Sequence, residues 1–342
     1  MNFIAILVVC LTGNLTGTLG LSFSQKRTST TSIFHRVGRI GAPTASDVYG
    51  GSHISGSSSS SSSSSTGSRS VSPSPSSLQR KDGSPSALRM VPPVAFDAAM
   101  VSVFKEALLA NGLYAFALSF VKKLPLTPAG LVHSAILGTG LWTFLGVKGY
   151  LVCVIYLVLG SLVTKVKQQE KERLGIAEKR GGARGPENVW GAAATAMVCA
   201  MMTYVMPAHS AAFKVGYVAS LATKLSDTFA SEIGKAYGKT TYLITTMKIV
   251  PKGTEGAVSV EGTVAGVVGS ILMTAVGMLL GQITTMQGFI ACIIAALVAT
   301  TFESYIGAAY QDQNPWLTNE LVNLLNTVVG ALVGIAVVVG WR

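Results

Sequence analysis

Long apolar stretches separated by short polar breaks fill the chain from Val91 onward. A helix of about 20 mainly apolar residues crosses a bilayer, and most of the stretches approach that length. The pattern therefore predicts an all-α, polytopic membrane helix bundle of about 6–8 spans over residues 93–342. The first and fifth candidate spans fit least well, because the first is short and the fifth contains Lys214. The candidate spans lie near 107–121, 128–147, 149–166, 188–206, 209–225, 257–281, 287–309 and 320–341.

Composition supports a membrane protein. Of the 342 residues, 49% are hydrophobic and only 12% are charged, and the mean hydropathy is +0.50. Soluble domains are about one quarter charged. The four cysteines, Cys10, Cys153, Cys199 and Cys292, lie in apolar stretches and form no CxxC pair. This placement favours buried, reduced thiols over a disulfide framework or a zinc site.

The basic residues predict the orientation of the bundle. If eight spans alternate in direction, the breaks at 122–127, 167–187, 226–256 and 310–319 share one face. That face holds most of the lysines and arginines, whereas the opposite face has little besides Lys148 and the C-terminal Arg342. The positive-inside rule places the crowded face on the side of synthesis, which is the stroma in a plastid. Because the basic excess is divided between these loops and the N-terminal region, it does not indicate nucleic-acid binding.

Residues 1–92 have the composition of a targeting region. Residues 1–22 include the short apolar run FIAILVVCL and are typical of a signal peptide. Residues 23–92 are rich in hydroxyl and basic residues and contain a run of serines, so they are typical of a transit peptide followed by disorder. The combination resembles the bipartite presequence of algae with complex plastids. The alternative is a secreted or mitochondrial protein with a disordered tail.

The stretch KLSDTFASEIGKAYGKT, residues 224–240, places charges beside hydrocarbon. Acidic side chains at a membrane are costly, and they are usually paired or functional. Asp227 and Glu232 are candidates to bind Mg²⁺, which is commonly held by one or two carboxylates together with substrate phosphates. Lys235 is a candidate to neutralise phosphate charge. The alternative is a set of salt bridges that closes a loop at the membrane surface.

Polar residues in other segments fall on the same predicted face. Their convergence favours a functional site over helix packing alone. The chain has no Walker loop, no GxGxxG motif and no repeated polar rings, which argues against a soluble-type phosphate cradle and against a channel. The candidate substrate-binding and phosphate-binding residues are Arg184, Asn188, Lys248, Lys252, Thr254, Glu255 and Asn323, and Glu303 joins Asp227 and Glu232 as a candidate metal ligand.

Four segments carry a family resemblance: SDTFASEIGKAYGK, PKGTEGAVSVEGTVAG, FESYIGAAYQ and TNELVNLLNTVVGA. They resemble the motifs of a transmembrane family that includes the plastid phytyl-phosphate kinases, and the resemblance covers residues 97–342. They are also similar to the motifs of CTP-dependent polyprenol and phytol kinases. One departure is Glu303-Ser304, where many members carry Asp-Ser. A glutamate can still hold a metal.

This resemblance implies a plastid membrane kinase that converts phytyl phosphate to phytyl diphosphate, feeding tocopherol and phylloquinone synthesis. The implied cofactors are Mg²⁺ and a nucleoside triphosphate, CTP or ATP, and the implied catalytic residues are Asp227, Glu232 and Lys235. The implied location is the inner envelope or the thylakoid membrane of an algal complex plastid. Two alternatives come from other classes: a transporter of an isoprenoid or small anionic metabolite, and a scaffold in which the acids could be replaced without consequence.

Overall fold

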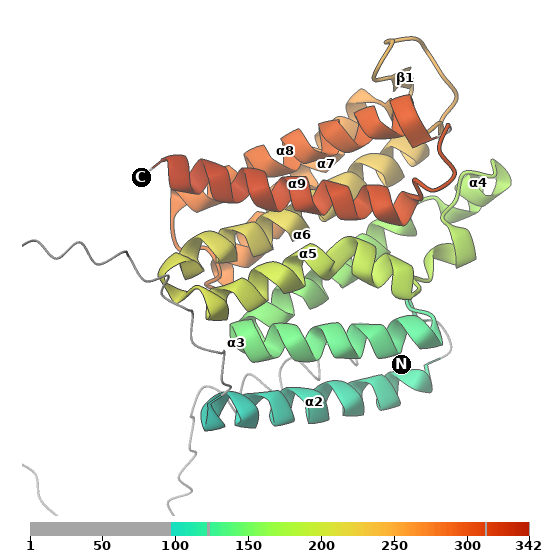
Figure 1. Ribbon diagram of the computed structural model, residues 1–342. Helices are drawn as coiled ribbons and strands as arrows, with labels where there is room; N and C mark the ends of the chain where they lie inside the picture. Colours follow the sequence, from blue (N-terminus) through green and yellow to red (C-terminus); the bar gives the residue numbers. More distant parts are fainter. Residues whose placement is uncertain (1–96, 122–123, 312, 342) are drawn as a thin grey trace, which may run out of the picture. The chain divides into compact units, whose positions relative to one another are not determined.

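The computed structural model describes residues 97–121, 124–311 and 313–341, and helices dominate these ranges (Figure 1). The all-α prediction is confirmed, whereas the predicted targeting segments 1–22 and 23–92 lie outside the described residues. The long helices are α2 (Ala98–Ser119), α3 (Pro128–Thr164), α5 (Pro186–Val205), α6 (Ser210–Tyr237), α7 (Val260–Leu279), α8 (Met286–Ile306) and α9 (Asn319–Gly340). The short elements are α4 (Gln168–Arg173), the 3-10 turns Lys179–Gly182 and Pro207–His209, the π-helical turn Gly307–Gln311, and the paired strands β1 (Tyr242–Leu243) and β2 (Ala257–Val258).

Helix α3 folds back on itself at Gly146, whose φ of 69° and ψ of −179° interrupt the helix. Gly130, near the start of α3, and Gly160, near its end, both lie against Arg184. In a straight helix these two glycines would be about 45 Å apart. The two arms of α3 are therefore antiparallel, and the break at Gly146 confirms the predicted boundary between the spans 128–147 and 149–166.

Six helices in the described part of the chain are long and apolar enough to cross a membrane, and α3 is one of them. Helix α6 is not among them because Lys214, Lys224 and Asp227 lower its hydropathy. Its 28 residues would nevertheless extend about 42 Å, which exceeds the thickness of a bilayer core. With α6 and the two arms of α3, the described bundle comprises eight helical segments.

Two predicted spans differ from the helices that form. The span predicted from residue 107 begins at Ala98, where Asp97 caps α2 by accepting a hydrogen bond from Met100 N at 2.7 Å. The charged pair Lys105–Glu106 lowers the local hydropathy, so the hydropathy pattern did not predict this helix start. The span predicted to end at residue 225 continues to Tyr237, so the charged stretch after Lys224 belongs to α6 and not to a loop.

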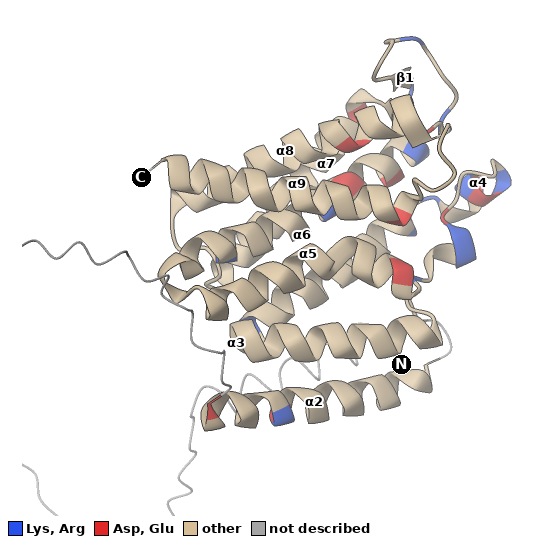
Figure 2. Ribbon diagram, in the orientation of Figure 1, with Lys and Arg blue, Asp and Glu red and all other residues tan. Residues whose placement is uncertain are grey.

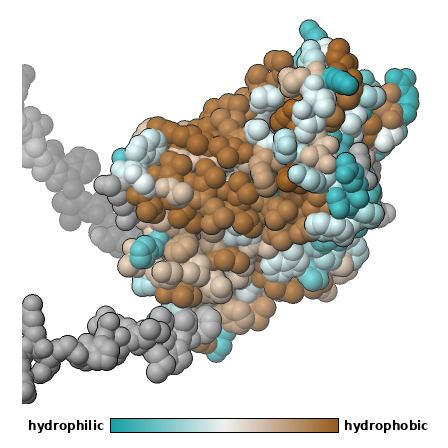
Figure 3. All heavy atoms as spheres, turned by 45° about the horizontal axis from the view of Figure 1, so that its top comes forward, coloured by the Kyte–Doolittle hydropathy of each residue, from teal (hydrophilic) through white to brown (hydrophobic). Residues whose placement is uncertain are grey.

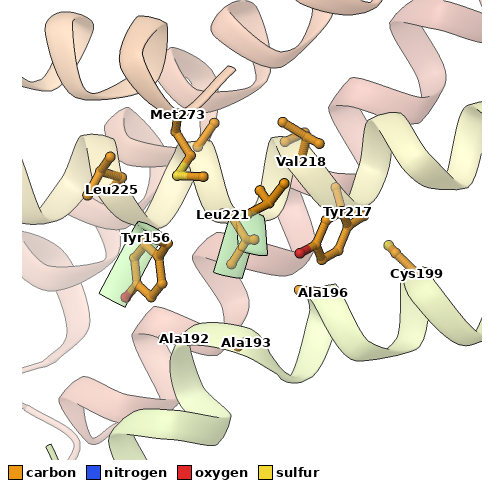
Figure 4. Close-up of a cluster of buried hydrophobic side chains, with 14 of the residues drawn as sticks. Tyr156, Ala192, Ala193, Ala196, Cys199, Tyr217, Val218, Leu221, Leu225 and Met273 are labelled. Carbon is orange, nitrogen blue, oxygen red and sulfur yellow. The ribbon is translucent and has the colours of Figure 1, made fainter. Parts of the chain in front are cut away.

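Helix α6 forms the centre of the bundle and packs against α5, α7, α8 and α9. Its Tyr217, Leu221 and Leu225 are fully buried and meet small residues of α5 and Met273 of α7 (Figure 4). Apolar side chains also cover the outside of the bundle, as Figure 3 shows for one face. Leu109 and Phe116 of α2, for example, are 65% and 67% exposed. An apolar core inside an apolar surface is the arrangement expected in lipid.

Most charged side chains gather at one end of the bundle (Figure 2). The loops at this end touch one another: Leu126 forms a β-bridge with Arg184, Lys167 Nζ donates to Ala236 O at 3.3 Å, and Gly256 packs against the end of α8. These contacts bring the breaks predicted at 122–127, 167–187 and 226–256 to one face, together with the end of α8, which leads into the break predicted at 310–319. Hereafter this face is called the polar end.

Candidate functional site

Lys224 lies at the centre of a buried polar cluster near the polar end. Its Nζ donates to the Asp227 carboxylate, one helical turn further along α6, and to Asn323 Oδ1 of α9 at 2.7 Å. Lys224 is 9% exposed. A buried lysine requires such partners, because an isolated ammonium would be strongly disfavoured away from water.

Glu303 brings a second carboxylate to this place. It accepts a hydrogen bond from Asn326 Nδ2, and Asp227, Lys224 and Glu255 all lie close enough to act on its charge. Asn326 is fully buried, and its Oδ1 has no hydrogen-bond partner among the described residues. We call Lys224, Asp227, Glu303, Asn323 and Asn326 the Lys224 cluster.

The depth of the Lys224 cluster follows from the helix ends. Glu303 lies three residues before the last residue of α8, and Asn326 lies seven residues after the first residue of α9. At 1.5 Å per residue, Glu303 and Asn326 are about 5–10 Å inside these ends. Along α6, Asp227 and Lys224 lie 10 and 13 residues before the last residue, Tyr237, which places them about 15–20 Å from that end. The cluster therefore lies between the middle of the bundle and the polar end.

Arg184 borders the cluster through Tyr156. Arg184 Nη1 donates to Tyr156 Oη at 2.8 Å, and the guanidinium carbon lies 5.4 Å from the centre of the tyrosine ring. Tyr156 in turn lies close enough to Lys224 to act on its charge. The backbone of Arg184 is held by Pro125 O and Thr127 N, each at 3.0 Å. Arg184 is thus a fixed cation beside the cluster.

Glu232 belongs to a different network. Its carboxylate forms an ion pair with Lys171 of α4, both side chains being 1% exposed, and lies 3.8 Å from Lys235 Nζ. Lys235 Nζ also lies 3.6 Å from Glu178. Among the described residues, no three His, Cys, Asp or Glu side chains are placed to hold one metal ion. The structure thus does not bring Glu232 together with Asp227 and Glu303, the other two residues predicted as metal ligands.

Asn188 connects two helix starts. Its Oδ1 accepts hydrogen bonds from Gly185 N at 3.0 Å and from Arg180 Nη2 at 2.9 Å, and its Nδ2 donates to Glu320 at 3.4 Å. Arg180 also pairs with Glu187. These contacts cap α5 and join it to α9, so Asn188 lies at the polar end but outside the Lys224 cluster.

The loop between α6 and α7 carries the other candidates. Thr254 Oγ1 donates to Pro251 O at 2.8 Å, Lys248 is exposed and Lys252 is half-buried. A side chain at Gly256 would lie within 2.4 Å of Ser304 O, so the loop approaches the end of α8 very closely there. This approach brings Glu255 near Glu303, and Glu255 is the loop candidate with an electrostatic effect on the cluster.

Three residues of the site were not selected from the sequence. Lys224 stands one helical turn before Asp227 in the charged stretch, a spacing that could have identified it. Asn326 follows Asn323 at a spacing of three on the same helix and gave a weaker signal of the same kind. Tyr156 lies within an apolar run, and no feature of the neighbouring sequence identifies it as a site residue.

These observations define a class: a multi-pass integral membrane protein with a buried cluster of opposite charges between its middle and its polar end. The chain belongs to the family described as integral membrane protein DUF92, whose model matches residues 111–331.

Relatives with known sequences agree with this membership. The chain is 52% identical to an uncharacterised membrane protein of Synechocystis, over 67% of this chain and 89% of the relative. It is 43% identical to Protein VTE6, chloroplastic, of Arabidopsis thaliana, over 76% and 81% of the two chains. It is 33% identical to an uncharacterised membrane protein of Methanocaldococcus jannaschii, over 65% and 89%. No solved structure matches the chain.

Proposed function

We propose that this protein is a plastid membrane kinase that transfers a phosphoryl group from a nucleoside triphosphate to phytyl phosphate. In the reaction, a phosphate oxygen of phytyl phosphate attacks the terminal phosphorus of the donor, and the bond to the departing nucleoside diphosphate breaks. The product, phytyl diphosphate, would feed tocopherol and phylloquinone synthesis. The proposal rests on the motif resemblance and on 43% identity to a relative named as chloroplastic.

The observation that carries the proposal is the position of the Lys224 cluster. It joins acids, amides and a lysine between the middle and the polar end of a bundle with an apolar surface. A substrate with a long isoprenoid tail and a phosphate head matches both the apolar helices and the polar cluster. The tail can lie among apolar helices while the phosphate reaches the cluster.

The residues of the cluster fit Mg²⁺. Asp227 and Glu303 provide two carboxyl groups, and Asn326 Oδ1 provides a buried oxygen that accepts no hydrogen bond from any described residue. Mg²⁺ is commonly held by one or two carboxylates and completes its shell with water and substrate phosphates. When bound, the ion would neutralise charge on the transferring phosphoryl group. Glu232 would not contribute, since Lys171 engages it.

Cationic side chains would complete the charge neutralisation. Arg184 is held beside the cluster by Tyr156, and Lys252 lies in the loop that approaches Glu303. Lys235 is engaged by Glu178 and Glu232, so we place it in the structural network. The attacking phosphate is already anionic, so the transfer needs positioning and electrostatic stabilisation more than a strong base.

The test is an assay of the purified full-length protein in detergent with phytyl phosphate, Mg²⁺ and either CTP or ATP. We expect phytyl diphosphate to form with at least one nucleotide and to require the metal. Preparations that contain folded protein but form no phytyl diphosphate with either nucleotide would overturn the proposal.

A further inference from the structure

Lys224 holds a position that a metal ion would also favour. Its Nζ contacts the Asp227 carboxylate and, at 2.7 Å, Asn323 Oδ1. Carboxylate and amide oxygens are also the ligands that hard divalent cations take. A metal ion that binds Asp227 must therefore share this carboxylate with the ammonium group or displace it.

Two features indicate that the ammonium does not complete the cluster. Asp227 and Glu303 bring two carboxyl groups to the single ammonium of Lys224. Asn326 is fully buried and donates through Nδ2 to Glu303, but its Oδ1 finds no hydrogen-bond partner in the part of the chain that the structure describes. A buried acceptor without a partner is costly. Both features point to a second cation beside Glu303.

We propose that Lys224 is a phosphate-binding residue, and that metal binding releases its ammonium group from Asp227. Asp227, Glu303 and Asn326 Oδ1 would hold the divalent cation, and the Lys224 ammonium would be free to bind a phosphate oxygen of the substrate. This inference rests on the proposed function and deepens it, because it assigns the side chain that receives the phosphate. A lysine suits the role, since its ammonium is a compact charge on a flexible stem.

The proposal makes metal and phosphate cooperate. Each ligand draws one member of the Lys224–Asp227 pair away from the other, so each should bind more tightly in the presence of the other, and by the same factor. Replacing Lys224 by a residue without an ammonium group should change the affinities for metal and for phosphate in opposite directions. The metal should then bind more tightly, because a neighbouring positive charge is gone, and the phosphate should bind more weakly.

The experiment uses the full-length protein purified in detergent and measures bound Mn²⁺ from the loss of the EPR signal of the free ion. Lys224→Met should bind Mn²⁺ about tenfold more tightly than the wild type, or better. It should also lose about tenfold in affinity for phytyl phosphate. Lys214→Met is the matched control, because it removes a lysine from the other end of the same helix, and it should change neither affinity. Asp227→Asn should weaken Mn²⁺ binding strongly.

Unchanged or weaker Mn²⁺ binding by Lys224→Met would overturn the inference. The wild type provides a second test that needs no variant: phytyl phosphate should tighten Mn²⁺ binding about fivefold or more, and no change would contradict the coupling. Titrations with CTP and ATP form a third arm. If Lys224→Met weakens their binding and not that of phytyl phosphate, the assignment to the substrate phosphate is wrong.

The outcomes also separate this inference from the kinase proposal. If the Mn²⁺ results hold while the wild type forms no phytyl diphosphate, the kinase proposal fails and the Lys224 site stands. If the wild type forms phytyl diphosphate but Lys224→Met has normal turnover and normal Mn²⁺ affinity, the kinase proposal stands and the Lys224 inference fails.

Discussion

The Lys171 ammonium and the Glu232 carboxylate form an ion pair in which each side chain is only 1% exposed. Lys171 Nζ also donates to Thr164 O at 2.8 Å, so the pair ties the short helix α4 to the end of α3 and to α6. Lys167 adds a second connection by lying 4.4 Å from the ring centre of Tyr237. The loop that leads to Arg184 is thereby fixed at the polar end, which gives Glu232 a structural role.

The first prediction concerns this pair. Glu232→Gln leaves the Lys171 charge buried without its partner and should lower the free energy of unfolding by about 3–5 kcal/mol. The double variant Lys171→Met/Glu232→Leu removes both charges and should recover most of that loss. Thermal unfolding in detergent measures the stability, and turnover per folded molecule is measured beside it. A Glu232→Gln protein of normal stability with lost turnover would place Glu232 in catalysis after all.

The second prediction concerns Asp227. Asp227→Asn keeps the shape of the side chain and removes the charge that a metal needs, so the rate of phytyl diphosphate formation should fall on the order of a hundredfold or more. The matched control is Lys148→Met, an exposed lysine at the opposite end, which should leave the rate unchanged. The rate is measured per folded molecule at limiting Mg²⁺. Full turnover of Asp227→Asn under these conditions would show that Asp227 is structural.

The third prediction concerns orientation. A cysteine introduced at Lys179, which is exposed at the polar end, should react with a membrane-impermeant maleimide added from the stromal side. A cysteine at Lys148, exposed at the other end, should react only from the opposite side. Labelling of intact and opened plastid membranes separates the two cases. The reverse pattern would invert the orientation, although the common position of the loops would remain.

The fourth prediction concerns the turn in α3. Gly146 has a φ of 69° and a ψ of −179°, a backbone conformation almost restricted to glycine, and no other residue approaches the place of its missing side chain. Gly146→Ala should therefore cost about 1–3 kcal/mol through the backbone alone. Gly112→Ala in α2 is the control, because it also meets no neighbour but lies in a regular helix, and it should not destabilise. Equal unfolding temperatures for the two variants would contradict the argument.

The sequence by itself predicted the helices, the division into a charge-rich face and a charge-poor face, and the face on which the candidate residues meet. These features follow from local hydropathy, because lipid accepts only helices or closed barrels and charges collect where the chain leaves the membrane. The start of α2 was missed where Lys105 and Glu106 interrupt the apolar pattern. The continuation of α6 past residue 225 was missed for the same reason, since its charges face protein and not lipid.

Only the tertiary structure decided which charges pair. Asp227 and Glu232 are neighbours in the sequence, but five residues turn a helix by about 140° beyond a full turn, so they face different helices. Asp227 meets Lys224 on its own face, and that lysine reaches Asn323 across 99 residues. Glu232 instead meets Lys171 across 61 residues. Such pairings depend on how whole helices pack, and a local pattern of charges contains no information about partners that arrive from distant segments.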